Sequence, residues 1–146
     1  MIPTAPLVLG LAGLIPFLWG AATFLNDQVG IWGVQNIGPR FVAPFVMLNY
    51  GQIILAFMSG VLWGFATRAK ASQAAVGYGL SVIPALWVFF TIGAGQSASA
   101  IYLITGFVGL LALDWTFFTW GLTPEWWMRL RLLLTAIVVG CLSVLV

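Results

Sequence analysis

The sequence predicts an all-α integral membrane protein, a bundle of five transmembrane helices with a cytoplasmic N-terminus and a periplasmic C-terminus. Three observations carry this prediction. Hydrophobic residues make up 62% of the chain and charged residues only 5%, whereas ordinary soluble domains are roughly 25% charged. Long apolar runs recur along the whole chain, and its Lys and Arg residues are distributed unevenly among the connecting segments.

Five apolar runs are each near the length that a membrane-spanning helix needs. Only helices or closed barrels satisfy their backbone polar groups in lipid, and the alternating pattern of barrel strands is absent. We therefore expect one transmembrane domain over residues 1–146. Its helices are expected at residues 6–25, 41–67, 74–93, 98–121 and 129–146.

The first run resembles a signal peptide only in its position. No charged residue precedes Pro6, and the sequence "WGAATF" is a poor cleavage site, so the features of a signal are missing. We expect this run to be a retained helix. Pro16 predicts a kink within it.

A polar connector, "NDQVGIWGVQNIGPR", separates the first run from the second. Residues 41–67 would be about 40 Å long as a helix, whereas the hydrocarbon core is about 30 Å thick. The second run is therefore expected to tilt, or to begin as an interfacial segment that ends near Pro44.

Short connections join the remaining runs. A basic turn, "RAKASQ", leads into the third run, and "AGQS" separates the third run from the fourth. Pro84 lies inside the third run and frees the carbonyl of Leu80, four positions earlier, from its helical hydrogen bond, which adds a polar group at this depth of the run.

The positions of the basic residues predict the orientation. With the N-terminus inside, the inner segments contain Arg68, Lys70, Arg129 and Arg131, and the outer segments contain only Arg40. Inner loops of membrane proteins carry the excess of Lys and Arg. We expect a multi-pass protein of the bacterial inner (cytoplasmic) membrane.

Several short segments of this sequence are shared with a known family. They are, in order, "GLAGLIPF", "YGQIILAFMSGVLWG", "SVIPALWVFF" and "LALDWTFFTWGLTPEWWMRLRLLLT". The chain resembles the bacterial domain-of-unknown-function family 3429, which includes the eukaryotic mitochondrial transmembrane protein 69. The resemblance covers nearly the whole chain apart from the connector at residues 26–40. It implies a multi-pass inner-membrane protein and supplies no catalytic residues.

Asp114 lies inside an otherwise apolar run, about 10 Å from its inner end by helical rise. An ionised carboxylate deep in a bilayer costs about 3 kcal/mol on insertion scales, so it faces protein, pairs or takes up a proton. Two interpretations remain open. In the structural one, an ion pair with an arginine joins the fourth helix to the fifth. In the functional one, Asp114 is a proton or cation site.

Counting residues from the helix ends places further polar groups at the depth of Asp114. The expected intramembrane polar layer consists of Asp114, Ser59, Ser81 and Thr135, with Arg129 or Arg131 reaching into it. The two arginines lie about 200° apart on a helix, so they cannot both face one partner. Trp126 and Trp127 are expected to anchor the start of the last helix at the membrane interface.

The second helix carries two further features. Asn49 and Gln52 begin a polar stripe that continues at three- and four-residue steps, which indicates packing within the bundle or, alternatively, a water-filled path. Gly60 and Gly64, in "GVLWG", form a small-xxx-small pattern that allows close approach of another helix, and we expect them to pack closely within the bundle.

The composition excludes most cofactor chemistry. The chain has no histidine and only one cysteine, Cys141, which excludes a His-ligated haem, a Cys/His zinc site, a cysteine-ligated cluster and an intrachain disulfide. No basic patch for nucleic acid is present. We expect no cofactor, no metal and no catalytic residues.

Three classes of function remain. The first is a non-catalytic accessory, assembly or scaffold protein, whose partners are membrane lipid and other membrane proteins or copies of itself. The second is a small oligomeric transporter or proton-conducting protein that uses Asp114. The third is a membrane enzyme in which Asp114 and Glu125 perform the acid–base work.

Overall fold

The computed structural model describes residues 1–146 and contains helices and no strand. Four apolar segments are long enough to cross a membrane. They are Thr4–Leu25, Phe45–Ala66, Ala71–Thr91 and Gln96–Thr119. The all-helical, membrane-type fold predicted from the sequence is therefore confirmed.

Two of these segments are broken helices. The first consists of α1 (Thr4–Ala12) and α2 (Ile15–Leu25), and the third of α5 (Ala71–Ser81) and α6 (Ile83–Thr91). Each second half carries a proline at its second position, Pro16 or Pro84. The ring of an internal proline clashes with the carbonyl four residues earlier. The kink predicted in the first run is confirmed.

The connector between the first and second spans is a helix, which the sequence analysis did not predict. Helix α3 covers Asp27–Asn36, and the Asn26 side chain accepts hydrogen bonds from the amides of Gln28 and Val29 at its start. This is ordinary N-capping, which stabilises a helix of mixed composition. A short 3-10 turn, η1 (Pro39–Phe41), leads from α3 to α4 (Phe45–Ala66).

Helices α7 (Gln96–Thr119) and α8 (Trp127–Ser143) form the last hairpin. Gly121, with φ +72°, ends α7, and the amide of Leu122 reaches back to the carbonyl of Phe117. Helix α8 has 17 residues, or about 26 Å, and is shorter than the four spans. The fifth crossing predicted from the sequence stays a prediction.

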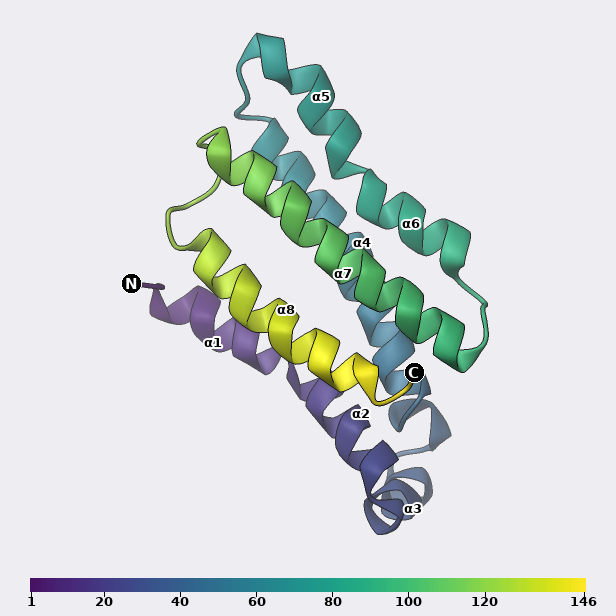
Figure 1. Cartoon of the computed structure of the whole chain (residues 1–146). Coiled ribbons are helices and arrows are strands. Elements are labelled where there is room, and N and C mark those ends of the chain that lie inside the picture. Colours follow the sequence, from purple (N-terminus) through teal and green to yellow (C-terminus); the bar gives the residue numbers. More distant parts are fainter.

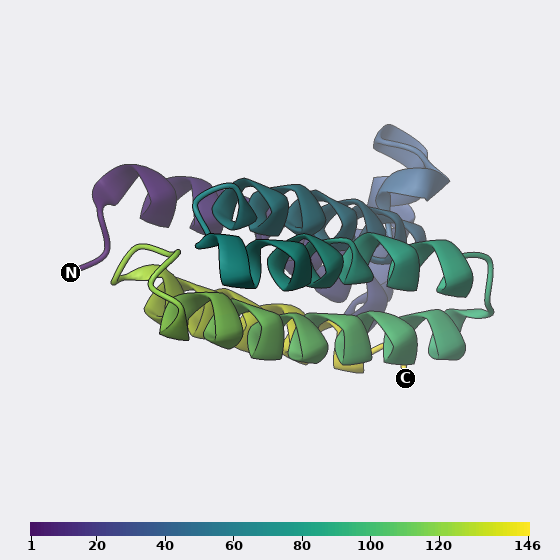
Figure 2. The same cartoon turned by 90° about the horizontal axis from the view of Figure 1, so that it is seen from above.

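The helices are arranged in two layers, with α4, α5 and α6 in one and α7 and α8 in the other (Figure 2). Figure 1 shows the N-terminus, the α4–α5 turn and the α7–α8 turn at one end of the bundle. The core between the helices includes Phe17, Leu55, Phe107 and Leu142, all at most 1% exposed. Large apolar side chains elsewhere are exposed, as expected for helices surrounded by lipid.

Candidate functional site

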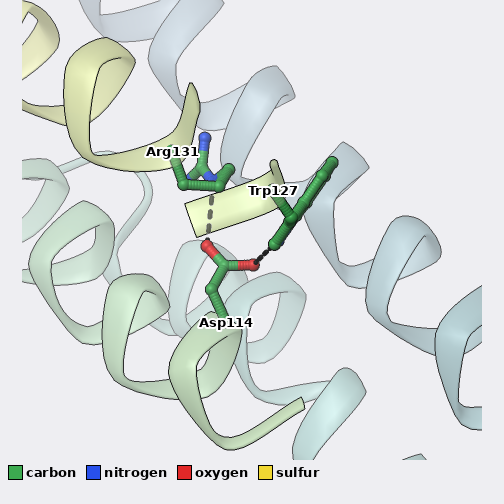
Figure 3. Close-up of polar contacts among 3 residues, drawn as sticks. All are labelled: Asp114, Trp127 and Arg131. Atoms are coloured by element: carbon green, nitrogen blue, oxygen red, sulfur yellow. Dashed lines mark hydrogen bonds and ion pairs between the residues drawn. The ribbon is translucent and has the colours of Figure 1, made fainter. Parts of the chain in front are cut away.

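The most distinctive polar site joins α7 to α8. Asp114, on α7, is fully buried. Its Oδ2 accepts a hydrogen bond from Arg131 Nε at 2.8 Å, which is also an ion pair, and its Oδ1 accepts one from Trp127 Nε1 at 2.9 Å (Figure 3). Trp127 and Arg131 are four residues apart and therefore lie on one face of α8. Both carboxylate oxygens are thus engaged by the neighbouring helix.

The sequence allowed either Arg129 or Arg131 as the partner of Asp114, and in the structure Arg131 is the partner. Arg131 is 5% exposed, whereas Arg129, two residues earlier, is exposed. This separation follows from the helical rotation between them. Loss of one partner from such a buried, hydrogen-bonded pair is strongly destabilising, because it leaves an uncompensated buried charge.

Trp127 has a second role that its position in the sequence did not indicate. It was predicted only as an interface anchor, together with Trp126. Both tryptophans are half-buried, and the Trp127 ring packs edge-on against Phe65 of α4 while its N–H reaches Asp114. The spacing of Trp127 and Arg131 on α8 was the available signal for this contact.

The other members of the predicted polar layer have separate partners. Ser59, on α4, accepts a hydrogen bond from the amide of Ala85 at 2.8 Å. Ser81 donates to the carbonyl of Tyr78 within its own helix. No hydrogen bond joins Ser59, Ser81 or Thr135 to Asp114. The four side chains therefore do not form one connected network.

The contact from Ser59 has a clear physical cause. Ala85 is the third residue of α6, where a helix has backbone amides without partners of their own. Within a membrane such amides need a protein acceptor, and serine side chains of neighbouring helices supply it. Ser59 therefore caps a helix that begins in the middle of a span.

Thr135 is buried beside the ion pair and is unsatisfied. Its side chain is 3% exposed, and its hydroxyl has no hydrogen-bond partner. Arg131 Nη2 is likewise buried without a partner. Thr135 and Arg131 are one turn apart on α8.

The two residues that begin the predicted polar stripe of α4 differ in exposure. Asn49 is exposed and Gln52 is half-buried, and neither makes a side-chain hydrogen bond with the rest of the chain.

The prediction that Gly60 and Gly64 pack closely within the bundle is wrong. Both are exposed, and a Cβ placed on either would meet no atom within 4 Å. Close approaches between the spans occur instead at Gly20, where a Cβ would clash with Met47, and at Gly106, where it would lie 2.5 Å from Leu55. A small-xxx-small pattern permits close packing, but the helix crossing decides which small residues are used.

Two comparisons with known proteins give matches. The model of a family described as "Protein of unknown function (DUF3429)" matches residues 2–146. The chain is also similar to Transmembrane protein 69 of Xenopus tropicalis, with 32% identity over 141 residues. That alignment covers 94% of this chain and 51% of the relative, so the chain spans about half the length of that protein.

No solved structure matches. The family match covers nearly every residue, including the connector at residues 26–40, which lies outside the shared segments. The chain therefore belongs to the DUF3429 family of proteins of unknown function.

Proposed function

We propose that this chain is a non-catalytic protein of the bacterial inner (cytoplasmic) membrane, acting as an accessory, assembly or scaffold component through helix–helix and lipid contacts. One observation carries the proposal. The face of α4 that contains Gly60 and Gly64 is open and exposed. Small-residue faces are the surfaces on which membrane helices approach each other most closely, so this face suits a helix of another chain.

Asn49 supports the same proposal. It lies eleven residues before Gly60, or three helical turns, and so it shares that face of α4. Amide side chains on membrane helices form hydrogen bonds across helix–helix contacts. The face therefore offers both close packing and a polar contact to a partner.

The contacts of Asp114 favour this class over the alternative, a small oligomeric transporter or proton-conducting protein. Arg131 and Trp127 occupy both carboxylate oxygens. A proton-carrying carboxylate must exchange partners during its cycle, and this one is held by a buried guanidinium. The same occupancy argues against Asp114 as a general acid or base.

Association through α4 is tested with Gly60→Leu and Gly64→Leu. Because a side chain at either position meets open space, neither change is expected to lower the thermal stability of the isolated chain. Native mass spectrometry after mild extraction from membranes should show loss of the partner or homo-oligomer in both variants. Gly79→Leu, at another exposed and open glycine on α5, is the matched control and should retain the assembly. A wild-type chain that is monomeric and free of partners would overturn the proposal.

The proposed topology has five crossings with the N-terminus inside. After removal of Cys141, cysteines introduced at Ser72 and Ser97 should react with an impermeant reagent from opposite sides of the membrane. A cysteine at Val146 should react from the same side as Ser97 if α8 crosses. Reaction of Ser72 and Ser97 from one side contradicts this topology.

A further inference from the structure

A cavity lies where the first span departs from the bundle. The cavity has a volume of about 340 Å³. Helix α2 packs against both α4 and α8, whereas α1, beyond the break at Gly13 and Leu14, lies beside α8 (Figure 1). The change of direction at the break therefore leaves space between α1, α4 and α8.

The cavity is mainly apolar and reaches the lipid-facing surface. Ten of its 14 lining residues are hydrophobic. Its inner wall includes the buried side chains of Phe17, Phe107 and Val138. Leu9 and Phe57 also line it and are 73% and 63% exposed. The cavity thus extends to a surface that acyl chains would cover in a bilayer.

Two buried polar side chains are among the residues that line this cavity. Arg131 and Thr135 both line it, and Arg131 Nη2 and Thr135 Oγ1 have no hydrogen-bond partner. Their residues are 5% and 3% exposed. Buried polar groups without partners are rare in native proteins, and each one calls for an explanation. Tyr50 of α4 also lines the cavity, and its hydroxyl lies close to Gly13, another lining residue.

We propose that this cavity binds a neutral, lipid-like molecule whose carbonyl oxygen accepts hydrogen bonds from Arg131 and Thr135. A guanidinium N–H is a donor only, and a hydroxyl can donate, so the complementary group is an acceptor. The volume is within the usual range of ligand pockets. It admits the carbonyl and part of an acyl chain, and the remainder of the chain leaves past Leu9 and Phe57.

The charge of the site favours a neutral acceptor over an anion. Asp114 already balances Arg131 through the contact at 2.8 Å. A carboxylate or phosphate would bring an unbalanced negative charge into an apolar cavity, beside an existing carboxylate, at a large desolvation cost. An ester or ketone carbonyl satisfies the same donors without that cost.

The carbonyl can come from the ester of a membrane phospholipid or from a separate neutral lipid. Arg131 and Thr135 lie four and eight residues beyond Trp127, the first residue of α8, or about 6 and 12 Å along the helix. Arg131 therefore lies in the half of α8 next to the α7–α8 turn and Thr135 at the middle of α8, and a molecule entering from the adjacent lipid layer meets Arg131 first.

Photolabelling tests the proposal on the full chain in lipid nanodiscs. Three probes share one diazirine-bearing acyl chain and end in a methyl ester, a carboxylate or a methyl group. We expect the ester to label peptides of α1, α4 and α8 most strongly. Stronger labelling by the carboxylate, or equal labelling by the ester and the hydrocarbon, would overturn the proposal.

Substitutions at Thr135 separate binding from folding. Thr135→Val removes a hydroxyl that has no partner and nearly conserves volume, so the fold should persist. We expect it to lower ester labelling about fivefold, the value of one neutral hydrogen bond, and to leave hydrocarbon labelling unchanged. Thr105→Val, at an exposed threonine of α7 outside the cavity, should change neither. Unchanged ester labelling in a folded Thr135→Val protein contradicts the assignment.

Mass spectrometry of organic extracts identifies the source of the carbonyl. A phospholipid or a neutral carbonyl lipid should accompany the wild-type protein from native membranes and be depleted in Thr135→Leu, which fills the cavity. An equal lipid content in both proteins would contradict the proposal. Gly60→Leu should leave labelling unchanged, because Gly60 does not line the cavity. Failure of the α4 interface is therefore distinguishable from failure of this site.

Discussion

The two broken helices of this protein differ in what lies beside the break. Both breaks precede a proline at the second position of the following half-helix, Pro16 in α2 and Pro84 in α6. At the α5–α6 break, Ser59 of α4 accepts the hydrogen bond of the Ala85 amide. At the α1–α2 break, no side chain bonds an amide at the start of α2, and a cavity lies beside it.

The comparison shows that a proline determines where a membrane helix is interrupted but not what occupies the interruption. At the α5–α6 break, the hydroxyl of Ser59 on α4 accepts the hydrogen bond of a free amide of α6 and so joins α6 to α4. At the first break the neighbours are apolar, except for Arg131 and Thr135 on α8 and Tyr50 on α4. One break is therefore a structural joint, and the other borders a candidate binding site.

The largest effect is expected for the ion pair between Asp114 of α7 and Arg131 of α8. Arg131 also lines the cavity beside the α1–α2 break. Asp114→Leu leaves Arg131 buried without a counter-charge, and we expect the free energy of unfolding to fall by about 3–5 kcal/mol. Thermal unfolding in detergent measures this loss. Asp114→Leu combined with Arg131→Leu should recover part of it, and the double-mutant cycle gives the coupling energy. Additive effects of the two changes would show that the contact is not an energetic pair.

The second largest effect is expected at the α5–α6 break, where Ser59 bonds the Ala85 amide. Ser59→Ala leaves the Ala85 amide without an acceptor inside the bundle, so we expect a loss of about 2 kcal/mol. Ser143→Ala is the control, because Ser143 is exposed and donates only within α8, and it should be nearly neutral. Equal effects of the two changes in thermal unfolding would show that the cap contributes nothing.

A smaller effect is expected at Trp127. Trp127→Phe keeps the aromatic ring against Phe65 but removes the N–H that bonds Asp114 Oδ1. We expect the free energy of unfolding to fall by about 1 kcal/mol. Trp126→Phe should leave it unchanged, because Trp126 forms no hydrogen bond with Asp114. Thermal unfolding of both variants in one detergent compares them directly. A neutral Trp127→Phe would assign all of the stabilisation to Arg131.

The smallest effect on stability belongs to the cavity. Thr135→Val replaces a buried hydroxyl that has no partner with a methyl group, so the unfolding temperature of lipid-free protein should stay constant or rise slightly. Ser59→Ala and Thr135→Val thus change stability in different ways, although both remove one buried hydroxyl. A clear loss in Thr135→Val would mean that the threonine is already satisfied in the protein.

The sequence by itself determined the class of the protein and its helical spans. Apolar runs of this length have to satisfy their own backbone polar groups in lipid, so local composition is enough to identify four spans and a kink at Pro16. Helical rotation likewise showed that Arg129 and Arg131 could not share one partner. Such inferences depend only on residues that are close together in the chain.

Only the tertiary structure decided which faces meet. It selected Arg131 and Trp127 for Asp114, and it placed Gly20 and Gly106 rather than Gly60 and Gly64 at close approaches between spans. It also placed Arg131 and Thr135 in the lining of a cavity. The apolar residues of a membrane helix are suitable for either lipid or protein contact, so hydrophobic periodicity does not distinguish the two. The choice depends on crossing geometry between helices that are far apart in the sequence.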